Sequence, residues 1–126
     1  MKSNWLSEIV SRSEKGPYMK ESEYDLTLAK TVMNLVREYD LEYDPRTLVP
    51  SDDDLADRLY QASLDLFVGM GVYNQSTQRR ILFSKDEVTE AVAAAPNAVI
   101  LGTGKDAVIE RHREIEDLEP CCMHSG

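Results

Sequence analysis

The sequence has little of what catalytic centres and membrane spans usually need. Its 126 residues include two histidines, two cysteines and one tryptophan. With so few histidines, candidates for a general base are scarce. The longest apolar runs, residues 91–95 and 98–101, are far too short to cross a bilayer. We therefore expect no transmembrane segment, and no Ser/His/Asp set, Cys/His pair or carboxylate dyad suggests itself.

Positive charge is also scarce. Lys and Arg number 14 against 23 Asp and Glu, which gives a formal net charge of −9. Phosphate contacts need clustered Lys and Arg, so this balance argues against nucleic-acid binding. The hydrophobic content of 42% and charged content of 29% are typical of a soluble globular protein. The N-terminus, with Glu8 and no long apolar core, differs from a signal peptide, so we expect a cytoplasmic protein.

Apolar residues at helical spacing predict three long helices after a short one at residues 4–13, whose Trp5 we expect to cap a neighbouring element. The long helices begin at Ser22, at Ser51 and at the capping box of Ser84 with Glu87. We expect each to bury one stripe. The stripes are Leu26, Ala29, Met33 and Val36; Leu55, Leu59, Ala62, Leu66 and Met70; and Val88, Ala91, Val92 and Ala95.

Short β-prone pieces complete the organisation. Residues 72–73 and 80–83 flank a polar loop and predict a small hairpin. We divide the chain into four parts. These are an N-terminal segment with a short helix (1–21), a helical extension (22–97), a strand–turn–strand (98–113) and an acidic linker (114–126).

The segment from Gly102 to Ala107 formally fits G-x-G-x-x-A, the dinucleotide-binding turn that follows a strand. That motif also needs a helix next, and residues 108–113 show no amphipathic helical pattern. We therefore predict a tight turn between two antiparallel strands, 98–101 and 107–111, with a phosphate cradle as the alternative.

Three further groups of residues are candidate sites. The basic residues Arg111, His112 and Arg113 predict the polar side of a strand, with anion binding as the minority alternative. The group of Cys121, Cys122 and His124 lacks the paired spacing of zinc sites, so we expect free thiols. The acidic residues of 40–44 lack the glycine and distal glutamate of an EF-hand loop and predict a solvated rim.

Three stretches together resemble a known family. They are VPSDDDLADRLYQASLDLFVGMGVY, RILFSKDEVTEAV and VILGTGKDAVIERHR. This pattern is similar to the N-terminal part of the monomethylamine:corrinoid methyltransferases over residues 22–126, with LGTGKDAV as its most specific piece. Trimethylamine methyltransferases lack this run and are the second choice.

The resemblance implies an α/β fold, a (β/α)₈ TIM barrel in the full-length family, with this chain as its mostly helical N-terminal extension plus short strands. It implies transfer of the methyl group of methylamine to the cobalt of a separate corrinoid protein, in methanogenesis. The amine-binding residue of the family, pyrrolysine, would lie downstream of residue 126. A homo-oligomer is implied at full length.

No catalytic, cofactor-binding or metal-binding residue of the family carries over to a position of this chain. We therefore expect an N-terminal fragment that is inactive on its own, with apolar residues of the strand–turn–strand left open to solvent. The alternatives are a nucleotide-binding module built on the Gly102–Ala107 turn and a stand-alone helical interaction module.

Overall fold

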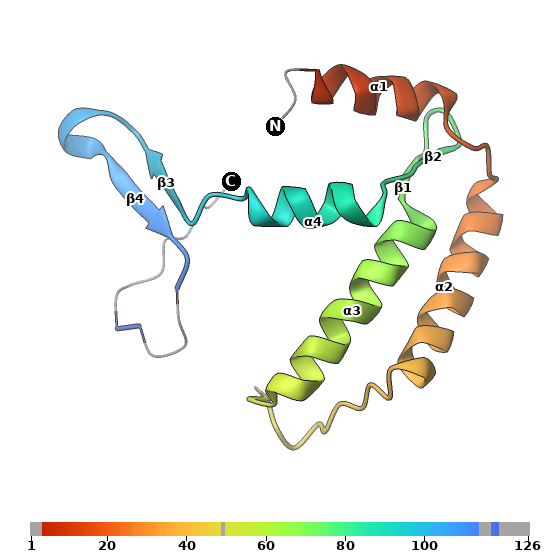
Figure 1. Cartoon of the computed structure of the whole chain (residues 1–126), viewed down its shortest axis with the longest axis horizontal. Helices are drawn as coiled ribbons and strands as arrows, with labels where there is room; N and C mark the ends of the chain where they lie inside the picture. The colour runs from red at the N-terminus through yellow and green to blue at the C-terminus, as the bar shows by residue number, and fades with distance from the viewer. Residues whose placement is uncertain (1–3, 49, 114–116, 119–126) are drawn as a thin grey trace. The chain divides into compact units, whose positions relative to one another are not determined.

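The computed structural model describes residues 4–48, 50–113, 117 and 118 (Figure 1). Contacts divide the chain into two compact units, residues 1–91 and 92–126. Within the described residues, no helix is long and apolar enough to cross a membrane. The elements are α1 (Trp5–Lys15), α2 (Glu21–Glu38), α3 (Asp53–Met70), β1 (Val72–Asn74), β2 (Arg79–Ile81), α4 (Lys85–Ala93), β3 (Ala98–Leu101), the 3₁₀ turn η1 (Gly104–Asp106) and β4 (Val108–Arg111).

Helices α2 and α3 form an antiparallel pair, side by side in Figure 1. At one end of the pair, Tyr24 stacks on Tyr73 with ring centroids 4.7 Å apart, and its hydroxyl donates to the Gly71 carbonyl at 3.2 Å. At the other end, the Arg58 guanidinium donates to the Tyr39 carbonyl at 2.8 Å. The Tyr39 hydroxyl in turn donates to Asp65 at 2.5 Å. Polar contacts therefore fix both ends of the pair.

The buried stripe of α2 differs from the predicted one. Leu26, Met33 and Val36, expected on the core side, are exposed, as is Ala29. The half-buried side chains of α2 include Tyr24, Leu28, Thr31 and Leu35, which recur at spacings of 4, 3 and 4. The prediction was wrong because α2 carries two apolar stripes, and contacts distant in sequence select the one that contains Tyr24.

The other two stripes are buried only in part. On α3, Ala62 and Met70 are buried and Leu55 and Leu66 half-buried, whereas Leu59 is exposed. On α4, Val88 is half-buried, whereas Ala91 and Val92 are exposed. Ala95, predicted to belong to the same stripe, is exposed and lies beyond the end of the helix at Ala93. Trp5 is exposed as well, which leaves the predicted capping role without support. Leu64 of α3 is buried although it lies outside the predicted stripe.

Helix starts follow the sequence closely, with two shifts. The capping box before α4 is confirmed, since the Ser84 amide donates to Glu87 at 2.8 Å and the Glu87 amide to the Ser84 hydroxyl at 3.2 Å. The cap of α3 is Asp52 instead of Ser51, because its carboxylate accepts the Leu55 amide at 3.1 Å. Helix α2 begins at Glu21 after Lys20, without a side-chain cap, so Ser22 lies inside the helix.

The predicted hairpin of the first unit is present as β1 and β2, paired antiparallel with Val72 opposite Ile81. The segment that follows α1 runs along β2. The Arg80 amide donates to the Pro17 carbonyl at 2.9 Å, and the Met19 amide to the Gln78 carbonyl at 3.0 Å. These bonds hold α1 on the hairpin.

In the second unit, β3 and β4 pair antiparallel with Ala98 opposite Arg111 and Leu101 opposite Val108. The predicted antiparallel pairing across the Gly102 turn is thus confirmed. As expected, Val99, Ile100 and Ile109 are exposed, whereas Leu101 is half-buried. Most of the predicted acidic linker, residues 114–116 and 119–126, lies outside the described residues.

Gly71 and Gly69 make a matched pair for testing this fold. Gly71 ends α3 with φ of +67°, and a Cβ there would lie 2.3 Å from the Ile81 carbonyl oxygen. We expect Gly71→Ala to lower the free energy of unfolding by at least about 2 kcal/mol, from the left-handed backbone and the clash. Gly69→Ala, with nothing within 4 Å of its Cβ, should instead stabilise α3 by up to about 1 kcal/mol. Urea denaturation of both variants measures the difference, and equal effects would contradict this account.

Candidate functional site

The Gly102–Ala107 turn is closed on itself. The Asp106 and Ala107 amides donate to the carbonyls of Thr103 and Gly104, both at 3.3 Å. A Cβ on Gly102, where φ is +84°, would lie 2.8 Å from the Asp106 carbonyl oxygen, so the glycine is needed for the turn itself. These amides are therefore engaged within the turn and do not point at a ligand.

A dinucleotide site also needs the N-terminus of a following helix to face the pyrophosphate. Here the turn contains only η1 and continues directly into β4. The nucleotide-binding alternative required a helix after Gly104, and the structure contradicts it.

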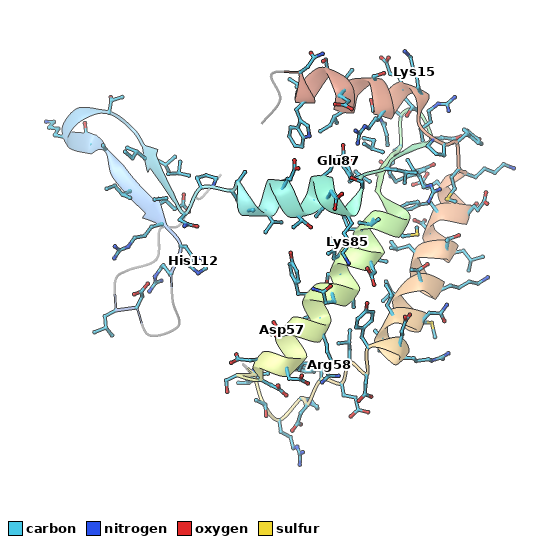
Figure 2. The ribbon with its side chains drawn as sticks, in the orientation of Figure 1. Lys15, Asp57, Arg58, Lys85, Glu87 and His112 are labelled. Atoms are coloured by element: carbon cyan, nitrogen blue, oxygen red, sulfur yellow. The ribbon has the colours of Figure 1, made fainter. Side chains whose placement is uncertain are left out.

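Two of the basic residues at the end of β4, His112 and Arg113, form hydrogen bonds within the second unit. The His112 amide donates to the Asn97 carbonyl at 2.8 Å, which continues the strand pairing by one residue. The Arg113 guanidinium donates to the Asp117 carbonyl at 2.9 Å. Figure 2 labels His112 at this end of the strand. The His112 amide and the Arg113 guanidinium thus both bond within the second unit.

No metal centre is found in the part of the chain that the structure describes, where no three His, Cys, Asp or Glu side chains gather. Cys121, Cys122 and His124 lie outside the described residues. On the acidic rim, the Asp44 carboxylate accepts from the Arg46 guanidinium at 2.9 and 3.0 Å and from the Arg46 amide at 3.0 Å. These bonds lower the pKa of Asp44. Asp44 of the rim is therefore paired with Arg46, two residues further along the chain.

The most developed cluster of polar side chains lies where α1 meets the start of α4, and we call it the Arg12 junction (Arg12, Glu8, Leu82, Phe83, Ser84 and Glu87). At its centre is a bidentate ion pair, in which the Arg12 guanidinium donates to the two carboxylate oxygens of Glu87 at 2.6 and 3.2 Å. Arg12 also donates to the Leu82 carbonyl at 2.9 Å and to Glu8, one turn earlier on α1, at 3.0 Å. Figure 2 shows Glu87 on the first turn of α4.

Aromatic rings extend the junction into the first unit. The Arg12 guanidinium lies 5.7 Å from the centre of the Phe83 ring, within the range of a cation–π contact. Phe83 stacks in turn on Phe67 of α3, with ring centroids 5.4 Å apart. One guanidinium thus contacts the start of α4 and, through Phe83, is linked to α3.

The ion pair shifts the pKa values of both Arg12 and Glu87. Hydrogen bonds from Arg12, and then from the Ser84 amide, lower the pKa of Glu87 to about 2. The bonds to Glu87 and Glu8 raise the pKa of Arg12. Both groups therefore stay charged around neutral pH and neither is available for proton transfer, so the junction is structural. Sequence patterns found Glu87 through its capping box, but its partner, 75 residues away, left no local signal.

Comparison with known proteins gives a match along nearly the whole chain. The family model described as "Monomethylamine methyltransferase MtmB" matches residues 6–126. Monomethylamine methyltransferase MtmB of Methanosarcina mazei is 29% identical over 120 residues, which are 94% of this chain and 26% of the relative. MtmB1 of Methanosarcina barkeri is 27% identical over the same shares. The chain thus spans about a quarter of the length of these relatives.

Solved structures agree with the sequence match. The crystal structure of the Methanosarcina barkeri monomethylamine methyltransferase superposes with a TM-score of 0.81 at 27% identity, covering 88% of this chain and 24% of the solved one. The structure of the hydroxylamine MtmB complex gives the same values. The match confirms the expected fold class, a mostly helical region with short antiparallel strands that forms a small part of a TIM-barrel enzyme.

The Arg12 junction predicts a specific dependence of stability on pH. The pKa of Glu87 is lower in the folded chain than its ordinary value of 4.5, so the pair stabilises the fold above that pH and stops doing so as pH falls towards 2. At pH 7 we expect Glu87→Gln to lower the free energy of unfolding by about 1–2 kcal/mol. The two proteins should converge near pH 2.

Glu90→Gln is the matched control, because Glu90 is exposed one turn further along α4 and carries the same charge. Urea denaturation at several pH values should give a difference between wild type and Glu87→Gln that shrinks as pH falls, and no such trend for Glu90→Gln. A pH-independent difference would contradict the role of the ion pair.

Proposed function

The chain belongs to the monomethylamine methyltransferase MtmB family, and from this premise we propose that it acts as the helical N-terminal part of a methylamine:corrinoid methyltransferase. In the proposed reaction the methyl group passes from the nitrogen of methylamine to the cobalt of a corrinoid protein, and ammonia leaves. The observation that carries the proposal is the family match over residues 6–126, supported by the superposition on solved MtmB.

The proposed role of this region is to support the enzyme without touching the reacting atoms. This assignment is supported by the Gly102 turn, where the Asp106 and Ala107 amides bond within the turn. The Arg12 junction holds its charges in mutual hydrogen bonds. In this proposal the corrinoid protein is a separate protein that accepts the methyl group. The amine binds in the part of the enzyme that lies outside the region matched by this chain.

The remaining features of the proposal come from the family resemblance. We place pyrrolysine, the barrel and the amine site in the three quarters of the relatives that lie beyond the match. The proposal also includes a cytoplasmic, homo-oligomeric enzyme that serves methanogenesis from methylamine. In this arrangement the present chain supplies a preformed scaffold, since two helices and a hairpin of its first unit are already fixed by internal contacts.

The test is a reconstitution of methyl transfer. The 126-residue chain alone, mixed with methylamine and a corrinoid protein of a Methanosarcina relative, should give no methylation of the corrinoid, followed by its visible absorbance. A Methanosarcina barkeri MtmB from which the matched region has been removed should also be inactive. Fusing this chain in place of the removed region, or supplying it in trans, should restore transfer.

Two controls make the outcome decisive. The variant Glu90→Gln should restore transfer as well as wild type does, because it alters one exposed charge outside the Arg12 junction. Circular dichroism and size-exclusion chromatography establish that the fusion is folded. Methylamine-dependent transfer by the isolated chain, or a folded fusion that is inactive, would contradict the proposal.

A further inference from the structure

Within the described residues, helix α4 is anchored near its start. The side chains of Glu87 and Val88 are half-buried, whereas every residue from 89 to 100 is exposed. The side-chain hydrogen bonds that join α4 to another element in this part of the chain are those between Glu87 and Arg12. The second half of α4 therefore gains little support from the rest of the described structure.

The start of α4 has two supports that act differently. Helix α4 has nine residues, and isolated helices this short are marginal in water. The capping box of Ser84 and Glu87 bonds to backbone amides at the helix start, so it favours the helical conformation itself. Arg12 comes from α1 and bonds to the same Glu87, so it bears on where the helix points.

Helix α4 is also the segment through which the chain passes into the second unit. The first unit ends at Ala91, whereas α4 continues to Ala93, and β3 begins soon after. The Ala95 amide donates back to the Val92 carbonyl at 3.2 Å, and Pro96 fixes its own φ. The connection that leaves α4 therefore has little conformational freedom, and the direction of α4 is passed on to the chain that follows.

We propose that the Arg12 junction sets the direction in which α4 leaves the first unit, and that breaking the Arg12–Glu87 ion pair frees α4 to reorient about Phe83. The Arg12 guanidinium bonds to both carboxylate oxygens of Glu87 and to the Leu82 carbonyl, on either side of the helix start. A planar group held at these points resists rotation of the helix more than a single bond does. The stack of Phe83 on Phe67 does not involve these hydrogen bonds and remains as the pivot.

Reorientation of α4 does not require the buried core to rearrange. The Arg12 and Glu87 side chains are 27% and 35% exposed, so water can replace either partner. The four buried hydrophobic side chains of the described structure belong to α3 and β2. Helix α1 keeps its own attachment to the first hairpin, because the Thr77 hydroxyl donates to the Ser13 carbonyl at 2.7 Å. The motion is therefore confined to α4 and the chain that follows it.

Residual dipolar couplings of the backbone amides in the full 126-residue chain test the proposal. In the wild type we expect the couplings of α4 to fit the same alignment tensor as those of α2 and α3. Arg12→Gln removes the ion pair but keeps the capping box, so α4 should stay helical by its Cα chemical shifts while its couplings lose that fit. The couplings of β3 and β4 should change together with those of α4.

Three further variants separate the direction of α4 from its charge and from helix formation. Ser84→Ala weakens the cap but keeps the ion pair, so helical shifts should weaken at the first turn while the couplings of the remaining turns still fit. Arg12→Lys keeps the charge without the bidentate geometry, so it should lose the fit as Arg12→Gln does. Arg46→Gln, which removes an exposed arginine paired with Asp44, should match the wild type.

Each of three results would overturn the proposal. The first is a wild-type α4 whose couplings do not fit the tensor of α2 and α3. The second is a fit that survives in Arg12→Gln or Arg12→Lys, which would reduce the junction to a contact without control of direction. The third is loss of the native shifts of β1 and β2 in Arg12→Gln, which would make the junction a folding contact of the whole first unit. The measurement needs no methyl transfer, so failure of the proposed function would leave it unaffected.

Discussion

The arrangement of helices and strands in the first unit depends on the bidentate ion pair between Arg12 and Glu87. The described residues include only four buried hydrophobic side chains, namely Ala62, Leu64, Met70 and Ile81. So small a core contributes little of the burial energy that usually fixes how helices and strands are arranged. The arrangement is instead specified by polar contacts at defined points. Arg12 supplies several of them, because one guanidinium bonds to Glu87 and to the Leu82 carbonyl while its flat face lies beside Phe83.

This reliance on polar contacts explains which structural predictions succeeded. The capping box at Ser84 and the tight turn at Gly102 depend on residues within a few positions of each other, so the sequence specifies them locally. The buried face of α2 depends on Tyr24 meeting Tyr73, far along the chain. Two stripes of similar hydrophobicity were available on that helix, and periodicity alone does not distinguish them. The error at Leu26 and Met33 therefore arose from the missing tertiary information.

Predictions about the candidate sites also succeeded where they depended on nearby residues and failed where they depended on contacts distant in sequence. Gly102 and Gly104 fit a phosphate-binding pattern, yet their positive φ values belong to a turn in which the Asp106 and Ala107 amides bond back to the turn's own carbonyls. A short glycine pattern predicts the backbone conformation well and the ligand poorly, because the ligand depends on the element that comes next. Here that element is a strand, which has no helix N-terminus to offer an anion. Conversely, the Arg12 junction was missed because its ion pair joins residues from opposite ends of the first unit.

In this region, polar contacts hold the geometry and several large apolar side chains lie at the surface. Identity to solved MtmB is only 27%, yet the backbones superpose with a TM-score of 0.81. In this chain, polar contacts such as those of Arg12 and Arg58, together with caps and glycines at turns, hold much of the geometry. Large apolar side chains such as Met33 are then not needed for the interior and remain at the surface. Exposed apolar area of this extent gains free energy when it associates. Burial of these faces against a further surface would therefore add stability that the described residues do not supply among themselves.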